Sequence, residues 1–272
     1  MLENHPCDKP TTKSQYRNIF NTEFNIGFFS PKKDMCLTCN LYNTKAEKDQ
    51  IGKEYALYIA NKCVAREAKN RDKEVSKKTE TVVTPCFDLQ KILTTLQSEV
   101  SLFYYKRKFK VYNFTIFDLG SAEGYCYAWD ETTGKKGPNE ISSALFDFIK
   151  RKFAGGALEF TSLFRLLWGT KSKSNNILMY IYAAKFININ ITHTFFEVGH
   201  SQSEGNSMHT LIMRRKKNQV VYVRQQWYTL IRCAKVTGKP YDLKELSQND
   251  ILDFKSMLKK MPNWDLDIDK RQ

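Results

Sequence analysis

The order of the secondary-structure elements that the sequence predicts is the feature that most constrains the fold. A β-branched segment precedes two alternating segments joined through a short turn, which is the pattern of a strand followed by a β-hairpin. Helical periodicity and apolar runs then alternate, as in helices that connect parallel strands. A hairpin-linked antiparallel trio followed by this alternation predicts a mixed sheet flanked by helices. The predicted segments are, in order, strands 79–90, 108–119 and 124–131, helix 138–153, strand 158–168, helix 175–186, strand 189–198 and helix 203–218.

The segments on either side of this core divide the chain into three parts. Residues 1–34 contain three prolines among many polar residues, so this stretch is predicted to be irregular. Residues 45–78 lack proline and repeat apolar positions at helical steps, which predicts one long charged helix. Further helices are predicted over 224–236 and within 247–261. The predicted parts are an N-terminal segment with a CxxC motif and a charged helical arm (1–78), a core (79–236) and a C-terminal helical tail (237–272).

The predicted order is that of the ribonuclease H-like fold, whose five-stranded mixed sheet holds divalent cations beside a phosphodiester. Two-metal phosphoryl transfer needs several carboxylates that converge on one spot. In this fold the acids lie on the first strand, at the end of the fourth strand and on the last helix. Asp88 takes the first position, but the fourth strand ends in "LLWGT" without an acid, and Asn206 lies on the inner turn of the helix.

Several stretches resemble a family of transposon-derived proteins, treated as a domain of unknown function, with a ribonuclease H-like (DDE transposase-like) core. The stretches that carry the likeness include "VAREAKNRDK", "FDLQKIL", "YAWDETTGKKGPNEISSAL" and "EVGHSQSEGNSMHTLI", and the likeness spans about residues 23–213. The resemblance implies that the second acid position falls on Gly169 and the third on Asn206. It also implies that His209 matches the family, whereas Met213 stands where a Glu is expected.

One carboxylate and one neutral amide form too weak a ligand set to bind two divalent ions. The sequence therefore predicts a catalytically inactive, transposon-derived protein with residual, sequence-nonspecific nucleic-acid binding. Two alternatives stay open. The long helix 45–78 would serve as the contact of a protein–protein interaction module. Substitute acids would instead restore an active nuclease or transposase that needs Mg²⁺ or Mn²⁺; the candidates are Asp130, Glu131, Glu197 and Glu204.

The charge balance favours a polyanionic partner. The chain of 272 residues has 43 Lys and Arg against 29 Asp and Glu, a formal net charge of +14, which indicates nucleic acid, DNA in particular. The alternative is a solvated, lysine-rich surface. The candidate nucleic-acid-binding residues form basic runs, of which 214–217 also resembles a nuclear import patch. They are Lys106, Arg107, Lys108, Lys171, Lys173, Arg214, Arg215, Lys216 and Lys217.

The apolar content and the cysteines indicate the cellular location of the protein. No apolar run reaches the roughly 18 residues of a membrane span, and the polar N-terminus lacks an apolar signal core, so no membrane partner is predicted. Seven scattered cysteines, an odd number, indicate reduced thiols rather than a disulfide frame. These features predict an intracellular protein, and the basic run 214–217 predicts a nuclear location.

Two smaller groups of residues are candidates for metal binding or for shaping the site. Cys36 and Cys39 form a CxxC that would supply half of a zinc site, with the alternative of reduced structural thiols. The candidates for the other half are His5, Cys7 and Cys63. His200 and His209 are candidates either for a ligand role or for hydrogen bonds that shape the loop, and the second interpretation is preferred.

Overall fold

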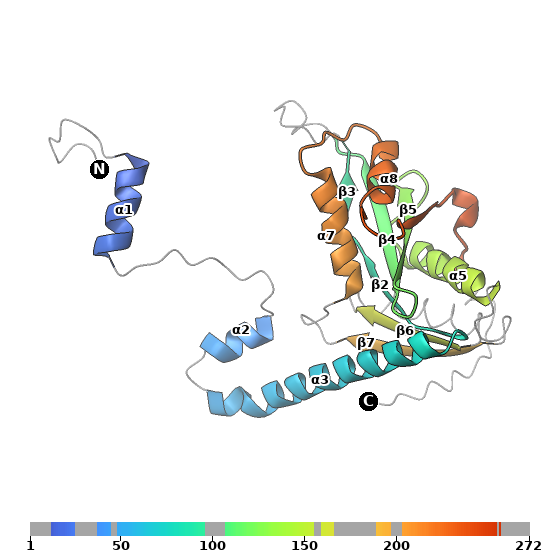
Figure 1. Ribbon diagram of the computed structural model, residues 1–272, viewed down its shortest axis with the longest axis horizontal. Helices are drawn as coiled ribbons and strands as arrows, with labels where there is room; N and C mark the ends of the chain where they lie inside the picture. Colours follow the sequence, from blue (N-terminus) through green and yellow to red (C-terminus); the bar gives the residue numbers. More distant parts are fainter. Residues whose placement is uncertain are drawn as a thin grey trace.

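The computed structural model describes residues 12–24, 37–44, 48–95, 107–154, 159–165, 189–196, 203–254 and 256. The elements within these residues are shown in Figure 1. They are α1 (Lys13–Glu23), α2 (Leu37–Thr44), α3 (Lys48–Lys78), β1 (Val82–Val83), β2 (Pro85–Leu89), β3 (Leu93–Thr94), β4 (Lys110–Asp118), β5 (Glu123–Asp130), α5 (Pro138–Ala154), β6 (Glu159–Arg165), β7 (Asn190–Phe196), α7 (Glu204–Lys216), α8 (Arg224–Arg232), β8 (Asp242–Glu245) and the 3₁₀ turn η1 (Gln248–Asp250).

The strands form one mixed sheet, which confirms the predicted α/β architecture. β2 lies between antiparallel β4 and parallel β6, while β5 continues the sheet beyond β4 and β7 continues it beyond β6. β1 pairs with β6 in the same register as β2 does, so β1 and β2 are two parts of one interrupted strand. Short β3 pairs with β4, and β8 adds a parallel strand beside β5.

Side-chain alternation gives the sheet two buried faces. On β4, Phe114 and Ile116 point toward α5, because strand residues two apart share a face. Val111 lies on the opposite face and packs in the cluster that contains Met208 of α7 and Trp227 of α8. Figure 1 shows α5 and α7 on opposite sides of the sheet. The fold is therefore a sheet between two helical layers, as the sequence predicts.

A close approach on the α7 face depends on a glycine. A Cβ atom at Gly124, the second residue of β5, would lie 2.7 Å from the ring of Tyr241 and 2.9 Å from the terminal methyl group of Met208. Real Cβ atoms do not tolerate such distances. The absence of a side chain at this position lets α7 and the segment before β8 pack directly on the strand.

Helix α3 spans 31 residues, close to the predicted 45–78, and its C-terminal half contacts the sheet. Ala65 packs against buried Cys86 of β2, and the Thr84 hydroxyl donates a hydrogen bond to the Asp72 carbonyl oxygen at 3.3 Å. Contacts thus cross the predicted boundary near residue 79. The pairing of β8 with β5 likewise joins the predicted C-terminal tail to the core.

Two sequence predictions need correction. The irregular stretch 1–34 contains helix α1, which begins with a capping box in which Thr12 and Gln15 exchange hydrogen bonds. The helix predicted over 224–236 ends at Arg232. In the range of the predicted tail helix, the 3₁₀ turn η1 comes first, and the described residues Phe254 and Ser256 are helical. The helix predicted over 175–186 lies outside the described residues.

No helix among the described residues has the length and apolar character that crossing a bilayer requires.

Candidate functional site

Asp88 lies near the C-terminal end of β2, at the centre of the sheet. Its neighbours Phe87 and Leu89 belong to the cluster on the α5 side, so the Asp88 side chain points to the α7 side. Only 2% of the residue is exposed, and its Oδ1 atom accepts a hydrogen bond from the Leu89 N–H at 2.8 Å. The acid predicted from the sequence is therefore a buried group beneath α7.

The N-terminus of α7 lies directly against Asp88. A Cβ atom at Gly205 would be 3.3 Å from the Asp88 Cβ atom, so the helix backbone approaches the strand here without a side chain between them. Asn206, at the third predicted acid position, is the next residue along α7. Gly169, at the second position, lies outside the described residues.

A row of hydrogen-bonded polar residues continues from Asp88 along α7. The Thr115 hydroxyl donates to the Asp88 carbonyl oxygen at 3.0 Å and lies 2.8 Å from the Nε2 atom of His209. Because that hydroxyl has a single hydrogen, Nε2 of His209 is the donor in the second bond. Gln90 donates to the His209 carbonyl oxygen and accepts from the Asn113 amide at 2.8 Å. His209 thus helps to fix α7 on the sheet; His200 lies outside the described residues.

Two lysines interact with acids of this site. Partial burial lowers the pKa of Lys136, and the negative charge of Asp88 acts in the opposite direction on that pKa. The Nζ atom of Lys69, on α3, lies 2.7 Å from Oε2 of Glu204 in a largely buried ion pair. The charge of Glu204 is therefore matched by Lys69, and Asp88 interacts electrostatically with Lys136.

Two of the other candidate substitute acids, Asp130 and Glu131, also have cationic partners. Asp130 is fully buried, accepts hydrogen bonds from Thr132 and Thr133, and forms an ion pair with Arg224. Burial alone would raise the pKa of Asp130, but the hydrogen bonds from Thr132 and Arg224 outweigh it and hold that pKa below its usual value. Glu131 lies 3.4 Å from Arg107, and Glu197 is outside the described residues.

The acidic side chains of the described residues do not gather at Asp88. Among the described residues, no group of three or more His, Cys, Asp or Glu side chains is placed to hold a metal ion. Two divalent cations next to a polyanion need several converging carboxylates. Of the two described acids next to the start of α7, Glu204 is paired with Lys69, and Asp88 interacts electrostatically with Lys136.

The predicted zinc half-site is described in part. The Cys39 thiol lies on α2 and accepts a hydrogen bond from the Tyr55 hydroxyl of α3 at 3.7 Å, where Tyr42 stacks on Tyr55. Cys63 is exposed on α3. Cys36, His5 and Cys7 lie outside the described residues. Zinc binding therefore stays a prediction.

Cys86 is close to Asp88 in sequence and faces the same side of the sheet. It is fully buried, and that burial raises the pKa of its thiol to about 12. The thiol is therefore a small buried group and not a nucleophile.

The predicted basic residues fall into two groups. Arg214, Arg215 and Lys216 end α7, and Lys217 follows as its C-cap residue. None of the four forms an ion pair with the described part of the chain. Lysine and arginine at a helix C-terminus also interact favourably with the helix dipole. Arg107 and Lys108 are exposed before β4, whereas Lys106, Lys171 and Lys173 lie outside the described residues. Residues 214–217 are thus one compact set of cations without an acidic partner among the described residues.

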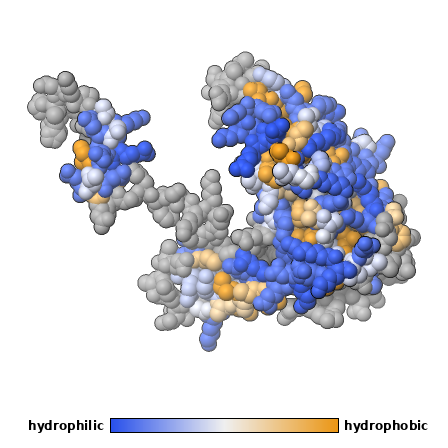
Figure 2. Space-filling model, in the orientation of Figure 1, coloured by the Kyte–Doolittle hydropathy of each residue, from blue (hydrophilic) through white to orange (hydrophobic). Residues whose placement is uncertain are grey.

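A cavity of about 640 Å³ lies beside these cations and was not predicted from the sequence. We name it the α7 groove, and it is lined by Gln90, Lys91, Ile92, Leu93, His209, Thr210, Met213, Arg214, Lys217 and Trp227. Figure 2 shows hydrophobic side chains between hydrophilic ones over the part of the molecule where α7 and α8 lie. The groove brings together the segment that follows Asp88 and the C-terminal turn of α7, so local sequence patterns could not reveal it.

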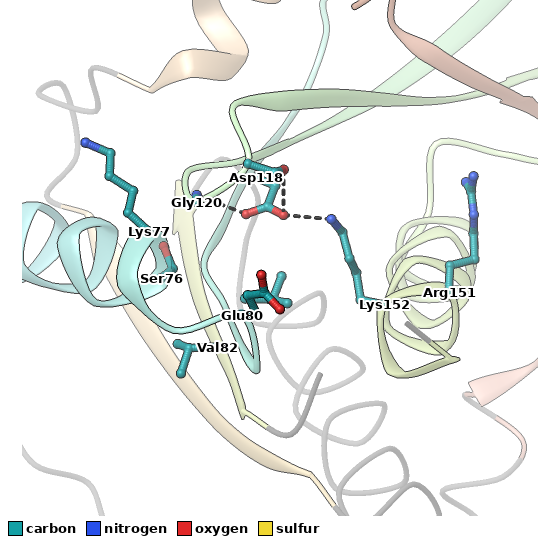
Figure 3. A pocket seen from close by; sticks show the side chains of 10 residues that line it. Ser76, Lys77, Glu80, Val82, Asp118, Gly120, Arg151 and Lys152 are labelled. Carbon is teal, nitrogen blue, oxygen red and sulfur yellow. Dashed lines mark hydrogen bonds and ion pairs between the residues drawn. The ribbon is translucent and has the colours of Figure 1, made fainter. Parts of the chain in front are cut away.

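A second cavity, of about 400 Å³, lies near the C-terminal ends of α3 and α5. Figure 3 shows Lys152 reaching toward Asp118, with which it forms an ion pair at 2.7 Å, while Arg151 points away. Asp118 also accepts a hydrogen bond from the Gly120 N–H at 3.1 Å. Within this cavity Asp118 and Lys152 therefore pair with each other, while Arg151 pairs with Asp242 outside it.

Two large aromatic side chains, Trp227 and Tyr112, are buried in the core and are not available to stack on a base. Trp227 lies within the α8 side of the core, and its indole N–H donates to the Thr94 carbonyl oxygen at 3.1 Å. Tyr112 packs against Trp129 on the α5 side.

The chain was compared with known proteins at three levels. It matches no protein-family model, and neither the search of curated proteins nor the search of solved structures finds a match.

Proposed function

We propose that this protein is a transposon-derived, ribonuclease H-like protein that no longer cleaves nucleic acid but still binds it without sequence specificity. The strand order supports the fold. β2, which carries Asp88, lies at the centre, with the antiparallel β4–β5 hairpin on one side and parallel β6 and β7 on the other. This is the order expected for a ribonuclease H-like sheet followed by its last helix.

The observation that carries the proposed loss of activity is the charge around Asp88. The neighbouring position on α7 is Asn206, whose amide oxygen carries no charge, and Glu204 is held by Lys69. Lys136 adds a positive charge close to Asp88. A centre of this kind repels a cation more than an array of free carboxylates would, so metal-dependent phosphoryl transfer is disfavoured.

Binding of nucleic acid is supported by the uncommitted cations at the end of α7. Cations that are not paired with protein acids can contact phosphates and release the counterions condensed on the nucleic acid. Phosphate contacts of this type position a strand but carry no sequence information. The net charge of +14 adds a general attraction for polyanions.

The test combines cleavage and binding with one preparation of the full chain. Labelled single-stranded and duplex DNA are incubated with the protein and Mg²⁺ or Mn²⁺, and binding is measured by fluorescence anisotropy at several salt concentrations. We expect intact DNA and an affinity that falls steeply with salt. Asp88→Asn should leave the affinity unchanged, because it removes a buried charge that does not contact phosphate. Metal-dependent cleavage that Asp88→Asn abolishes would show an active enzyme.

A second candidate function is supported by exposed apolar residues on α3. Leu57 and Val64 are 63% and 64% exposed, and their seven-residue spacing places them on one side of the helix. A protein–protein interaction module would use this stripe. Absent or salt-independent DNA binding, together with association that Leu57→Ser weakens, would favour this function over the first.

A further inference from the structure

The α7 groove differs from the second cavity, which contains the Asp118–Lys152 ion pair. Its cationic residues Lys91, Arg214 and Lys217 form no ion pair with the described residues, and no described acid lines it. Three cations around one groove leave a positive potential that a ligand can neutralise. Charge complementarity therefore indicates an anionic occupant.

The same groove has an apolar wall. Met213 is 44% exposed, and it lies with Ile92 and Leu93 along the groove, while Trp227 closes it from within. Charged phosphates are not stabilised by contact with an apolar surface. In a duplex the bases are stacked inside and cannot reach it. An unpaired base of a single strand has an apolar face that can cover it.

The position of the groove relates it to the buried acid. Gln90 lines the groove two residues after Asp88, and His209 lines it one helical turn after Asn206. A strand that passes the N-terminal end of α7 would therefore reach the groove by following the helix toward its basic last turn.

From these observations we infer that the α7 groove binds single-stranded nucleic acid. An unpaired base lies against Met213 and Ile92, and the flanking phosphates contact Lys91, Arg214 and Lys217. This inference rests on the proposed nucleic-acid binding and adds to it a preference for unpaired strands over duplex.

The test compares Met213→Ser with Val236→Ser in the full-length protein. Val236 is 82% exposed and does not line the groove, so its variant is a matched control for loss of exposed apolar surface. Fluorescein-labelled oligothymidylate and a duplex of equal length are the probes. We expect the wild type to prefer the single strand, and Met213→Ser to weaken its binding about fivefold, the effect of losing one small apolar contact. Duplex binding and the salt slope should stay unchanged, and Val236→Ser should behave as the wild type.

A cross-linking measurement keeps the inference testable without a variant. Oligonucleotides that contain 5-bromodeoxyuridine, irradiated on the wild-type protein and digested with trypsin, should mark the peptide that contains Met213 or the one that begins at Ile92.

Each other outcome decides between the proposals. Equal affinity for single strand and duplex, or equal weakening of both by Met213→Ser, would overturn the groove inference and leave nonspecific binding intact. Absence of binding to either probe would overturn the proposed function itself. Poly-glutamate that displaces the single strand as well as unlabelled oligothymidylate would show that the occupant is an acidic peptide, and would overturn the inference.

Discussion

Four consecutive cations at the end of α7 offer a charge experiment with an internal control. Arg214 and Lys217 are three residues apart, which places them on one side of the helix, and both line the α7 groove. Arg215 and Lys216 occupy the other sides. The double variants Arg214→Gln/Lys217→Gln and Arg215→Gln/Lys216→Gln therefore remove the same charge and the same residue types from different faces.

The expected size of the effect follows from counterion release. Each phosphate contact on a single strand contributes about 0.7 to the slope of log affinity against log salt, so two lost contacts lower the slope by about 1.4. At about 0.1 M salt this corresponds to roughly 25-fold weaker binding for Arg214→Gln/Lys217→Gln. The second double variant should lose less than about threefold, because charges that do not touch phosphate act only through a screened potential.

Fluorescence anisotropy with labelled oligothymidylate at four salt concentrations measures both quantities. Thermal unfolding of the two variants serves as the folding control, since both lose the same favourable interaction with the helix dipole. Indistinguishable slopes and affinities for the two variants would refute the assignment of phosphate contacts to the groove.

Three further predictions concern stability and reactivity. Asp130→Asn should lower the free energy of unfolding by about 2 kcal/mol near neutral pH, because it loses charge-assisted hydrogen bonds. Since the pKa of Asp130 is lowered in the folded state, this difference should be full above about pH 4 and shrink as pH falls further, as urea titrations at several pH values would reveal; a pH-independent difference would contradict it. Gly124→Ala should destabilise by about 1–3 kcal/mol through overpacking, and an unchanged melting temperature would count against the close approach described. Mass mapping after brief alkylation should find Cys63 and Cys233 modified and Cys86 protected until the protein is unfolded; early labelling of Cys86 would be inconsistent with its burial.

The main elements of the sheet were predictable because each carries its own periodicity. The hairpin alternation appears in β4 and β5 as a continuous register from the Val111–Asp130 pair to the Asp118–Glu123 pair. β8 escaped prediction because its four residues form a strand only where β5 offers a free edge. The α1 capping box was readable in the sequence, but nearby prolines outweighed it in the prediction.

The site likewise has features that the sequence predicts and features that it does not. Asp88 could be picked out because an acid near the end of a predicted strand is a local feature. The ion pair of Lys69 and Glu204 could not be predicted from the sequence, because 135 residues separate its partners and only the packing of α3 brings them together. The proximity of Lys136 to Asp88 likewise depends on the tertiary course of the loop before α5. Charges that decide whether the site can hold a metal thus come from distant segments.

Titration of the full-length protein with Mn²⁺, followed by the electron paramagnetic resonance of the free ion, tests the central claim most directly. If Asp88 lies among neutral and cationic groups, the signal should show no stoichiometric uptake of Mn²⁺, with or without bound DNA. Uptake of one or two ions per chain that Asp88→Asn abolishes would contradict the proposed loss of the metal site.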